Sequence, residues 1–305
     1  MASDPLIRIA AALEQLAATS GRPAQPLPAD PASAYLTDPA SVYLADPASA
    51  RLADPASGNW FVWDASGLAA VPVPRSPALA LYAGVDSQRD ALLENARRHA
   101  AALPAHDVLL WGARGMGKSS LVRAVQAKLI ADGADIAMVQ VAQPDLDTLP
   151  RLFTRLADCP RRFTIFLDDV ALDTQAAAGA GLVHALRSLL DGGVMARPEH
   201  LRLVVTSNRR NLVPRSMAEA DADPANPRDV ADDRLALADR FGLRLGFHAC
   251  DQDVYLAICR AYAAAHGLRF DAAAALTWAA GRGARSGRVA WQFTVETAGA
   301  AGVRL

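Results

Sequence analysis

The chain has 305 residues and a formal net charge of −1, from 31 lysines and arginines against 32 aspartates and glutamates. This length allows about two ordinary domains, and a hydrophobic content of 52% is enough to build a sizeable core. The charge balance disfavours a protein whose main work is electrostatic capture of nucleic acid or of an anionic membrane, although it leaves room for a local basic patch.

The three cysteines, Cys159, Cys250 and Cys259, form no C-x-x-C pair. This odd number of widely spaced thiols argues against a disulfide framework or a zinc site and favours reduced thiols in the cytoplasm. The first residues lack the basic and apolar regions of a secretory signal. The sequence contains no run of about 18 apolar residues, so no membrane span is expected. We therefore expect a cytoplasmic protein with no membrane partner.

The N-terminal part of the chain divides into a short helix and a repeat. Residues 1–20 predict a short amphipathic helix, because Leu6, Ile9 and Leu13 lie close to one face at helical spacing. The sequence Asp-Pro-Ala-Ser then occurs four times with a period of eight. The copies begin at Asp30, Asp38, Asp46 and Asp54.

An eight-residue period is too short for a solenoid unit, and each proline interrupts regular hydrogen bonding. Residues 21–58 are therefore predicted to be a low-complexity linker. The alternative is a docking segment whose regularly spaced tyrosine and leucine side chains bind a partner. These side chains are Tyr35, Leu36, Tyr43 and Leu44.

From residue 59 to residue 250 the pattern is that of an α/β domain. The stretch 59–82 predicts one or two strands packed onto this domain. Further strands are expected at 107–111, 135–141, 163–168, 201–207 and 243–248. Helices are expected at 86–102, 117–131, 146–158 and 179–191. Short apolar strands that alternate with helices predict a five-stranded parallel sheet covered on both faces.

Residues 251–305 have a different pattern, with no clear strand. They predict three or four helices, at 251–266, 271–280 and 286–300, and thus a small helical C-terminal domain.

The segment Gly112–Ser119 matches the phosphate-binding pattern G-x-x-x-x-G-K-[ST] between a predicted strand and a predicted helix. Its glycines let backbone N–H groups turn towards phosphates, and the helix N-terminus adds a partial positive charge. Lys118 can reach the β- and γ-phosphates, and the Ser119 hydroxyl can ligate Mg²⁺. The residues expected to bind the nucleotide here are Gly112, Ala113, Arg114, Gly115, Met116, Gly117, Lys118, Ser119 and Ser120.

A second motif, Phe163–Asp169, is an apolar strand that ends in two carboxylates, 50 residues after Lys118. Asp168 is expected to hold Mg²⁺, directly or through water, and Asp169 to orient and polarise the attacking water. The alternative is a buried strand followed by an acidic turn. The phosphate-binding motif earlier in the chain makes the catalytic interpretation the stronger one.

Three further polar side chains are candidates for the same site. Asn208 follows the predicted strand 201–207, where an amide can hydrogen-bond the attacking water or the γ-phosphate. Arg240 precedes the last strand and Arg288 begins a helix of the small domain, and arginine offers phosphate a fixed fork of donors. Taken alone, Asn208 would more often cap a loop, and each arginine would more often form a surface ion pair. For Arg240 the partner would be Asp239 or Asp233.

The order of these elements over residues 80–298 resembles that of the AAA+ ATPases, which have a P-loop α/β domain followed by a helical lid. In this resemblance Gly112–Ser119 is similar to the Walker A motif and Phe163–Asp169 to the Walker B motif. Asn208 resembles sensor 1, Arg240 the arginine finger and Arg288 the sensor 2 arginine. The strings 109–115, 206–214, 239–243 and 251–256 resemble most a bacterial family of predicted ATPases without an assigned biological role.

The resemblance implies an ATPase that binds ATP and Mg²⁺, with Val85 and the preceding residues from Tyr82 near the adenine. It also implies a homo-oligomer, as a ring or partial ring, that uses hydrolysis to remodel a macromolecular partner. Most AAA+ proteins have glutamate where this chain has Asp169, which is one CH₂ shorter, so the position of the water and the rate of hydrolysis stay open.

Two rival functions are compatible with the same residues. One is an ATP-gated adaptor with slow turnover that acts on a protein or a nucleic acid. The other is a DNA-associated loader that uses local positive charge, which the overall charge balance makes less favoured. The arginines that supply this charge are Arg209, Arg210, Arg215, Arg282 and Arg285.

Overall fold

The computed structural model describes residues 53–170, 186, 190, 197–208 and 237–305. The predicted N-terminal helix, the first three copies of the repeat and most of the predicted helix 179–191 lie outside the described residues. So do Arg209, Arg210, Arg215 and Asp233.

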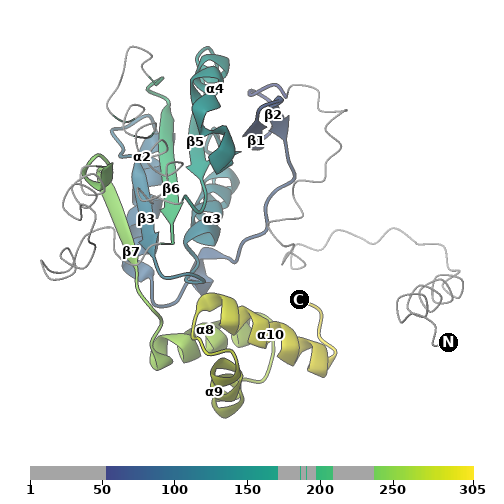
Figure 1. Ribbon diagram of the computed structural model, residues 1–305. Coiled ribbons are helices and arrows are strands. Elements are labelled where there is room, and N and C mark those ends of the chain that lie inside the picture. Colours follow the sequence, from purple (N-terminus) through teal and green to yellow (C-terminus); the bar gives the residue numbers. More distant parts are fainter. Residues whose placement is uncertain (1–52, 171–185, 187–189, 191–196, 209–236) are drawn as a thin grey trace, which may run out of the picture. The chain divides into compact units, whose positions relative to one another are not determined.

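The α/β part is built on a sheet of seven strands with the order β2-β1-β4-β5-β6-β3-β7 (Figure 1). These strands are β1 (Trp60–Asp64), β2 (Gly67–Ala70), β3 (Val108–Gly112), β4 (Ile136–Val141), β5 (Arg162–Leu167), β6 (Leu201–Ser207) and β7 (Leu243–Phe247). Every pairing is parallel except that of β1 with β2. The five predicted strands form the parallel part β4-β5-β6-β3-β7, and the predicted fold class is confirmed. The stretch 59–82 supplies two strands, β1 and β2, within the one or two expected there, and they join the same sheet, because β1 pairs directly with β4.

Helices cover both faces of the sheet. Val108 and Leu110 of β3 belong to the buried cluster of α2 (Asp86–Ala100) and α3 (Lys118–Ala131). Leu109, between them, belongs to the cluster on the other face, which includes the buried side chains of α4 (Leu149–Leu156). This alternation follows from the two-residue period of a strand. The sheet is therefore the middle layer of a three-layer unit.

Two short 3₁₀ segments, η3 (Leu79–Leu81) and η4 (Gln143–Thr148), lie in the connections. The second one precedes α4, so the helix predicted over 146–158 begins three residues later than expected, at Leu149. Pro150 lies in its first turn, where the missing N–H costs no helical hydrogen bond.

The C-terminal part consists of α8 (Gln252–Ala265), α9 (Ala272–Gly281) and α10 (Gly287–Ala301), as predicted (Figure 1). Each helix is preceded by a capping residue whose side chain accepts a hydrogen bond from a backbone N–H of the first turn. The capping residues are Asp251 for α8, Asp271 for α9 and Ser286 for α10. Such caps satisfy donors that the first turn leaves without partners. The three helices enclose a buried cluster of their own. Within the described residues, no helix has the length and apolarity needed to cross a membrane.

The fourth copy of the repeat, Asp54–Ser57, forms a turn. The Oδ1 of Asp54 accepts the N–H of Ala56 at 3.0 Å, while the N–H and hydroxyl of Ser57 both donate to the Asp54 carbonyl oxygen. Asp and Ser of the repeat thus close the turn, and Pro55 fixes the backbone between them.

The side chain of Arg161, next to β5, binds this turn through hydrogen bonds. It is 7% exposed and donates to the carbonyl oxygens of Pro55, Ala56 and Gly58 and to the Oδ1 of Asn59. Residues 53–58 were expected to belong to a linker, but they pack against the α/β part. The reason is a buried guanidinium whose donors need these acceptors.

His99 links α2 to β5 inside the core. Its side chain is 3% exposed, and its Nε2 lies 3.1 Å from the carbonyl oxygen of Phe163. Because a carbonyl only accepts, Nε2 carries the proton of the neutral ring. The Nδ1 atom is buried and has no hydrogen-bond partner among the described residues. Burial lowers the pKa of His99 to about 4.

Protonation of His99 is predicted to destabilise the fold in mild acid. The pKa in the folded state, about 4, lies below the ordinary 6.5, so the unfolded chain binds the proton first as the pH falls through 6.5. The free energy of unfolding then decreases by ~2 kcal/mol between pH 7.5 and 5, and this loss levels off below pH 4. Urea denaturation of the wild type, of His99→Gln and of the exposed-site control His248→Gln measures the effect. An undiminished pH dependence in His99→Gln would assign the effect to another group.

Candidate functional site

The glycine-rich loop leaves the carboxyl end of β3 and leads into α3. Strand β3 lies between β6 and β7, where the strand order reverses, and open α/β sheets bind ligands at such a point. Gly112, Gly115 and Gly117 have φ angles of 119°, 75° and 86°, in the region that favours glycine. A Cβ at Gly112 would lie 2.1 Å from the carbonyl oxygen of Phe247. The loop therefore requires glycine for close approach as well as for conformation.

The remaining loop residues divide into those that hold its shape and those that face outwards. The Ala113 N–H donates to the Phe247 carbonyl oxygen at 2.7 Å, and the Ser120 hydroxyl donates to the Gly117 carbonyl oxygen at 3.0 Å. Met116 is buried in the cluster beneath the loop, whereas Arg114 is exposed. Helix α3 begins at Lys118, so the N–H groups of its first turn have no partner within the helix.

Lys118 lies under the loop and is 5% exposed. Its ammonium donates to the carbonyl oxygens of Gly112 and Ala113, at 2.9 Å each, and to the Oδ1 of Asn208 at 2.8 Å. Burial lowers the pKa of Lys118 to about 8, although the carboxylates of Asp169 and Asp168 raise it. The lysine is therefore charged at neutral pH and is held by neutral acceptors that are weaker than a phosphate oxygen.

Asp168, just after β5, accepts hydrogen bonds from two hydroxyl groups. The Ser119 Oγ lies 2.5 Å and the Thr206 Oγ1 lies 2.6 Å from its Oδ1. The Oδ2 faces the Nη1 of Arg123 on α3, at 3.7 Å. The two predicted metal ligands, Ser119 and Asp168, thus lie in direct contact.

Asp169 turns away from the strand with a φ angle of 53°, in the left-handed region that aspartate tolerates better than most residues. Its carboxylate accepts a hydrogen bond from the Nδ2 of Asn208. Asn208 therefore connects Lys118, through its Oδ1, with Asp169, through its Nδ2.

Residues of the C-terminal helices reach the loop. The N–H of Arg288 donates to the Gly115 carbonyl oxygen at 3.0 Å, and a Cβ at Gly115 would lie 2.9 Å from the Oγ of Ser286. The side chain of Arg288 is exposed, and its charge, like that of Arg114, lowers the pKa of Lys118. The loop therefore has several positive charges around it.

The segment from Tyr82 to Val85 lies between the loop and α8. The ring of Tyr82 would be 3.3 Å from a Cβ at Gly117, and a Cβ at Gly84 would be 2.4 Å from Val254 of α8. The side chain of Val85 is 5% exposed and packs in the core cluster.

Arg240 lies at the other end of the sheet. It precedes β7, whereas Gly112 pairs with Phe247 at the far end of that strand. A strand of five residues spans about 17 Å, so the structure does not bring Arg240 to the loop of its own chain. Asp239, one of its predicted ion-pair partners, pairs with Arg244 at 2.6 Å.

Three residues near the loop were not predicted from the sequence, namely Arg123, Thr206 and Ser286. Thr206 and Arg123 each contact Asp168, and Ser286 caps α10 beside Gly115. A polar residue near the end of a buried strand, as at Thr206, was the available signal. Nothing local in the sequence distinguishes Arg123 from other helix-surface arginines.

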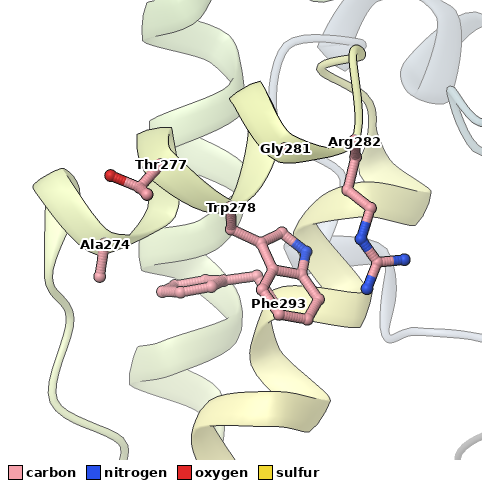
Figure 2. A pocket seen from close by; sticks show the side chains of 6 residues that line it. All are labelled: Ala274, Thr277, Trp278, Gly281, Arg282 and Phe293. Atoms are coloured by element: carbon pink, nitrogen blue, oxygen red, sulfur yellow. The ribbon is translucent and has the colours of Figure 1, made fainter.

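A hollow of about 490 Å³ on the C-terminal helices is separate from the loop. Figure 2 shows the indole of Trp278 beside the ring of Phe293, with the Arg282 side chain extended alongside. The guanidinium carbon lies 4.4 Å from the indole centroid. The other lining residues are Ala274, Thr277 and Gly281. None of these was a predicted nucleotide contact.

The sequence matches the family described as "Protein of unknown function (DUF815)" over residues 57–301. The chain belongs to this family. The match includes the glycine-rich loop, both carboxylates and the C-terminal helices. No curated protein matches the chain.

Several solved structures have a similar arrangement. One is the Thermotoga maritima RuvB Holliday junction branch migration motor, with 18% identity, a TM-score of 0.45, and coverage of 74% of this chain and 67% of that one. Domain III of the Thermotoga maritima replication initiation protein DnaA has 14% identity, a TM-score of 0.48, and coverage of 76% and 92%. The FIGL-1 AAA domain in complex with ADP has 20% identity, a TM-score of 0.42, and coverage of 66% and 64%.

The match to one RuvB mutant spans 63% of the length of the RuvB chain, which is less than two thirds.

Gly115→Ala is predicted to disturb the contact between the loop and α10. Gly283 provides a matched control, because its φ angle of 62° is similar to the 75° of Gly115, yet a Cβ there would meet nothing within 4 Å. Both alanines incur about 1–2 kcal/mol of left-handed strain. We expect Gly115→Ala alone to lose further stability and to bind a fluorescent ATP analogue more weakly. Equal effects of the two substitutions on thermal unfolding and on binding would contradict this.

Proposed function

We propose that this chain binds ATP with Mg²⁺ and hydrolyses it, as an AAA+ ATPase that drives remodelling of a macromolecular partner. The observation that carries the proposal is the hydrogen-bonded path from Lys118 through Asn208 to Asp169. It joins the proposed phosphate-binding ammonium to the proposed water-polarising carboxylate. The contact between Ser119 and Asp168 lies beside it.

The donor set fits a magnesium ion. The Ser119 hydroxyl and the Asp168 carboxylate are oxygen ligands, which Mg²⁺ prefers, and their 2.5 Å contact supports a shared ligand position. When bound, Mg²⁺ would neutralise negative charge on the β- and γ-phosphates.

The side chains of this chain would act on the γ-phosphate as follows. Lys118 would exchange its carbonyl acceptors for phosphate oxygens, because charge-assisted hydrogen bonds are the stronger ones. Asn208, released by the lysine, would keep Asp169 oriented and offer its amide to the water or the γ-phosphate. Asp169 would polarise the water that attacks phosphorus while the bond to the leaving ADP oxygen breaks. Arg288 and Arg114 would add positive charge around the phosphates.

The contacts of the C-terminal helices support a lid that responds to the nucleotide. The hydrogen bond from Arg288 to Gly115 ties α10 to the loop, and the segment from Tyr82 to Val85 touches both α8 and the loop. We propose that this segment borders the adenine, with Val85 supporting it from the core.

Substitution of Lys118 and of Asp169 tests the proposal. Lys118→Ala is expected to weaken ATP binding at least about tenfold, because the ammonium that meets the phosphates is lost. Asp169→Asn is expected to retain Mg·ATP and lose about 10²–10⁴-fold in turnover, since an amide cannot accept the proton. Lys128→Ala, an exposed lysine on the same helix, is the control. Equilibrium binding and phosphate release are measured for each variant, with circular dichroism as a check of folding.

Wild-type binding by Lys118→Ala would refute the phosphate role of the lysine. A normal rate for Asp169→Asn would place the base elsewhere.

The ATP-gated adaptor with slow turnover is the second candidate function, and the geometry of Asp169 is the observation that favours it. Its side chain is shorter than that of glutamate, and its left-handed backbone aims it at Asn208. A binding constant in the usual range together with a very small steady-state rate would support this candidate. No contact of the described residues favours a DNA-associated loader, because Arg282 lies over Trp278 and Arg285 near the Gln252 side chain.

We also propose that the active form is a homo-oligomer in which Arg240 reaches the γ-phosphate of a neighbouring chain. Arg240 is exposed and lies at the end of the sheet opposite its own loop. An arginine finger supplied in this way contributes about 10³–10⁵ in rate.

Specific activity is therefore expected to rise with protein concentration. Arg240→Ala is expected to lose about 10³-fold in turnover while it keeps nucleotide binding, and Arg244→Ala, which breaks a surface pair, serves as control. A mixture of Arg240→Ala with Lys118→Ala should recover activity, because one chain supplies the arginine and the other the intact loop. Activity that is independent of concentration and is not recovered by mixing would indicate a monomeric enzyme.

A further inference from the structure

The hydroxyl of Thr206 lies between the two acidic residues that follow β5. It donates to the Oδ1 of Asp168 at 2.6 Å and accepts the backbone N–H of Asp169 at 2.8 Å. The direction of both bonds is fixed, because a backbone N–H only donates and an ionised carboxylate only accepts. The side chain of Thr206 is 1% exposed, so water does not compete for either bond.

Thr206 also holds the residue after the acidic pair. Its carbonyl oxygen accepts the N–H of Val170 at 2.8 Å. Three consecutive residues are thus bound to one residue of β6, the first through its side chain and the next two through their N–H groups. Asp169, in the middle, adopts a left-handed backbone, which costs about 1–2 kcal/mol. These three hydrogen bonds offset the cost of the left-handed backbone at Asp169.

The arrangement sets the direction of both carboxylates. With the hydroxyls of Ser119 and Thr206 both on Oδ1 of Asp168, the Oδ2 points towards Arg123. In a strand that continued, Asp169 would point to the opposite face of the sheet. The left-handed turn instead brings its carboxylate to Asn208.

We infer that Thr206 is a positioning residue that aligns the metal-binding carboxylate of Asp168 and the water-polarising carboxylate of Asp169 together. This inference rests on the proposed function. The Thr206 hydroxyl is engaged by the two acidic residues themselves, Asp168 and Asp169. Its effect passes through Asp168, where it resembles the outer partners that orient metal ligands, whose loss typically costs 10–100-fold in metal affinity or activity.

A structural role alone would give a different result. Thr164 on β5 is the matched control, because it is also buried, at 7% exposure, and donates its hydroxyl to the Oε1 of Gln126 at 3.2 Å, within the core. Thr164→Val removes a buried hydroxyl without touching either carboxylate. A general loss of stability would therefore appear in both valine variants. Misalignment of the two carboxylates would appear only in Thr206→Val.

The experiment compares full-length wild type, Thr206→Val, Thr206→Ser and Thr164→Val. Binding of a fluorescent ATP analogue is measured with EDTA and with Mg²⁺, alongside kcat, KM and urea denaturation. For Thr206→Val we expect metal-free binding within about threefold of wild type, loss of about 10–100-fold in the tightening by Mg²⁺, and a similar fall in kcat. Thr206→Ser keeps the hydroxyl and should recover both. Thr164→Val should lose stability alone.

The inference is overturned if Thr206→Val and Thr164→Val respond alike to Mg²⁺ and have the same kcat, or if Thr206→Ser fails to recover either property. Should Thr206→Val not fold, Thr206→Ala takes its place with the same expected outcomes. Failure of the proposed function would look different, because the wild type itself would then show no Mg²⁺-dependent binding and no turnover. That result would remove the role of Thr206 as well.

Discussion

Parallel pairing of β3, β6 and β5 is the constraint on which the site depends. Leu110 pairs with Thr206, and Leu167 pairs with Val205, so three segments far apart in the chain end at the same edge of the sheet. This register brings a lysine, an amide and two carboxylates within hydrogen-bonding distance. Because side chains alternate along a strand, a slip of one residue in β6 would turn Thr206 to the other face and break both hydrogen bonds of its hydroxyl.

The polar groups at this edge are linked as two connected sets. One set joins Ser119, Asp168 and Thr206, and the other joins Lys118, Asn208 and Asp169. The N–H of Asp169 connects them, since it donates to the hydroxyl of Thr206. A phosphate that draws Lys118 away from Asn208 would therefore alter the hydrogen bonding of Asp169, because Asn208 contacts both residues. Through Gly115 and Arg288, the same loop is also in contact with the C-terminal helices.

Much of this could be predicted from the sequence, because the strands are short apolar runs and the glycine-rich loop has a strict spacing. Ser119 and Asp168 were each predicted from a separate motif to bind Mg²⁺, and their direct contact is a finding of the structure. Thr206 could not be predicted in its role, since its importance depends on the register between strands. The packing of residues 53–58 was also missed, because Arg161, which binds them, lies about a hundred residues later in the chain and no local pattern marks that contact.

We propose that the two sets of hydrogen-bonded residues form a site that hydrolyses ATP. A single-turnover measurement tests this hydrolysis, with the full-length protein in excess over Mg·ATP and with acid quenching to quantify phosphate. We expect the bound ATP to be converted to ADP and phosphate in one exponential phase, with one phosphate released for each ATP bound. Recovery of the bound ATP intact after many hours, or failure of the protein to retain Mg·ATP at all, would contradict it.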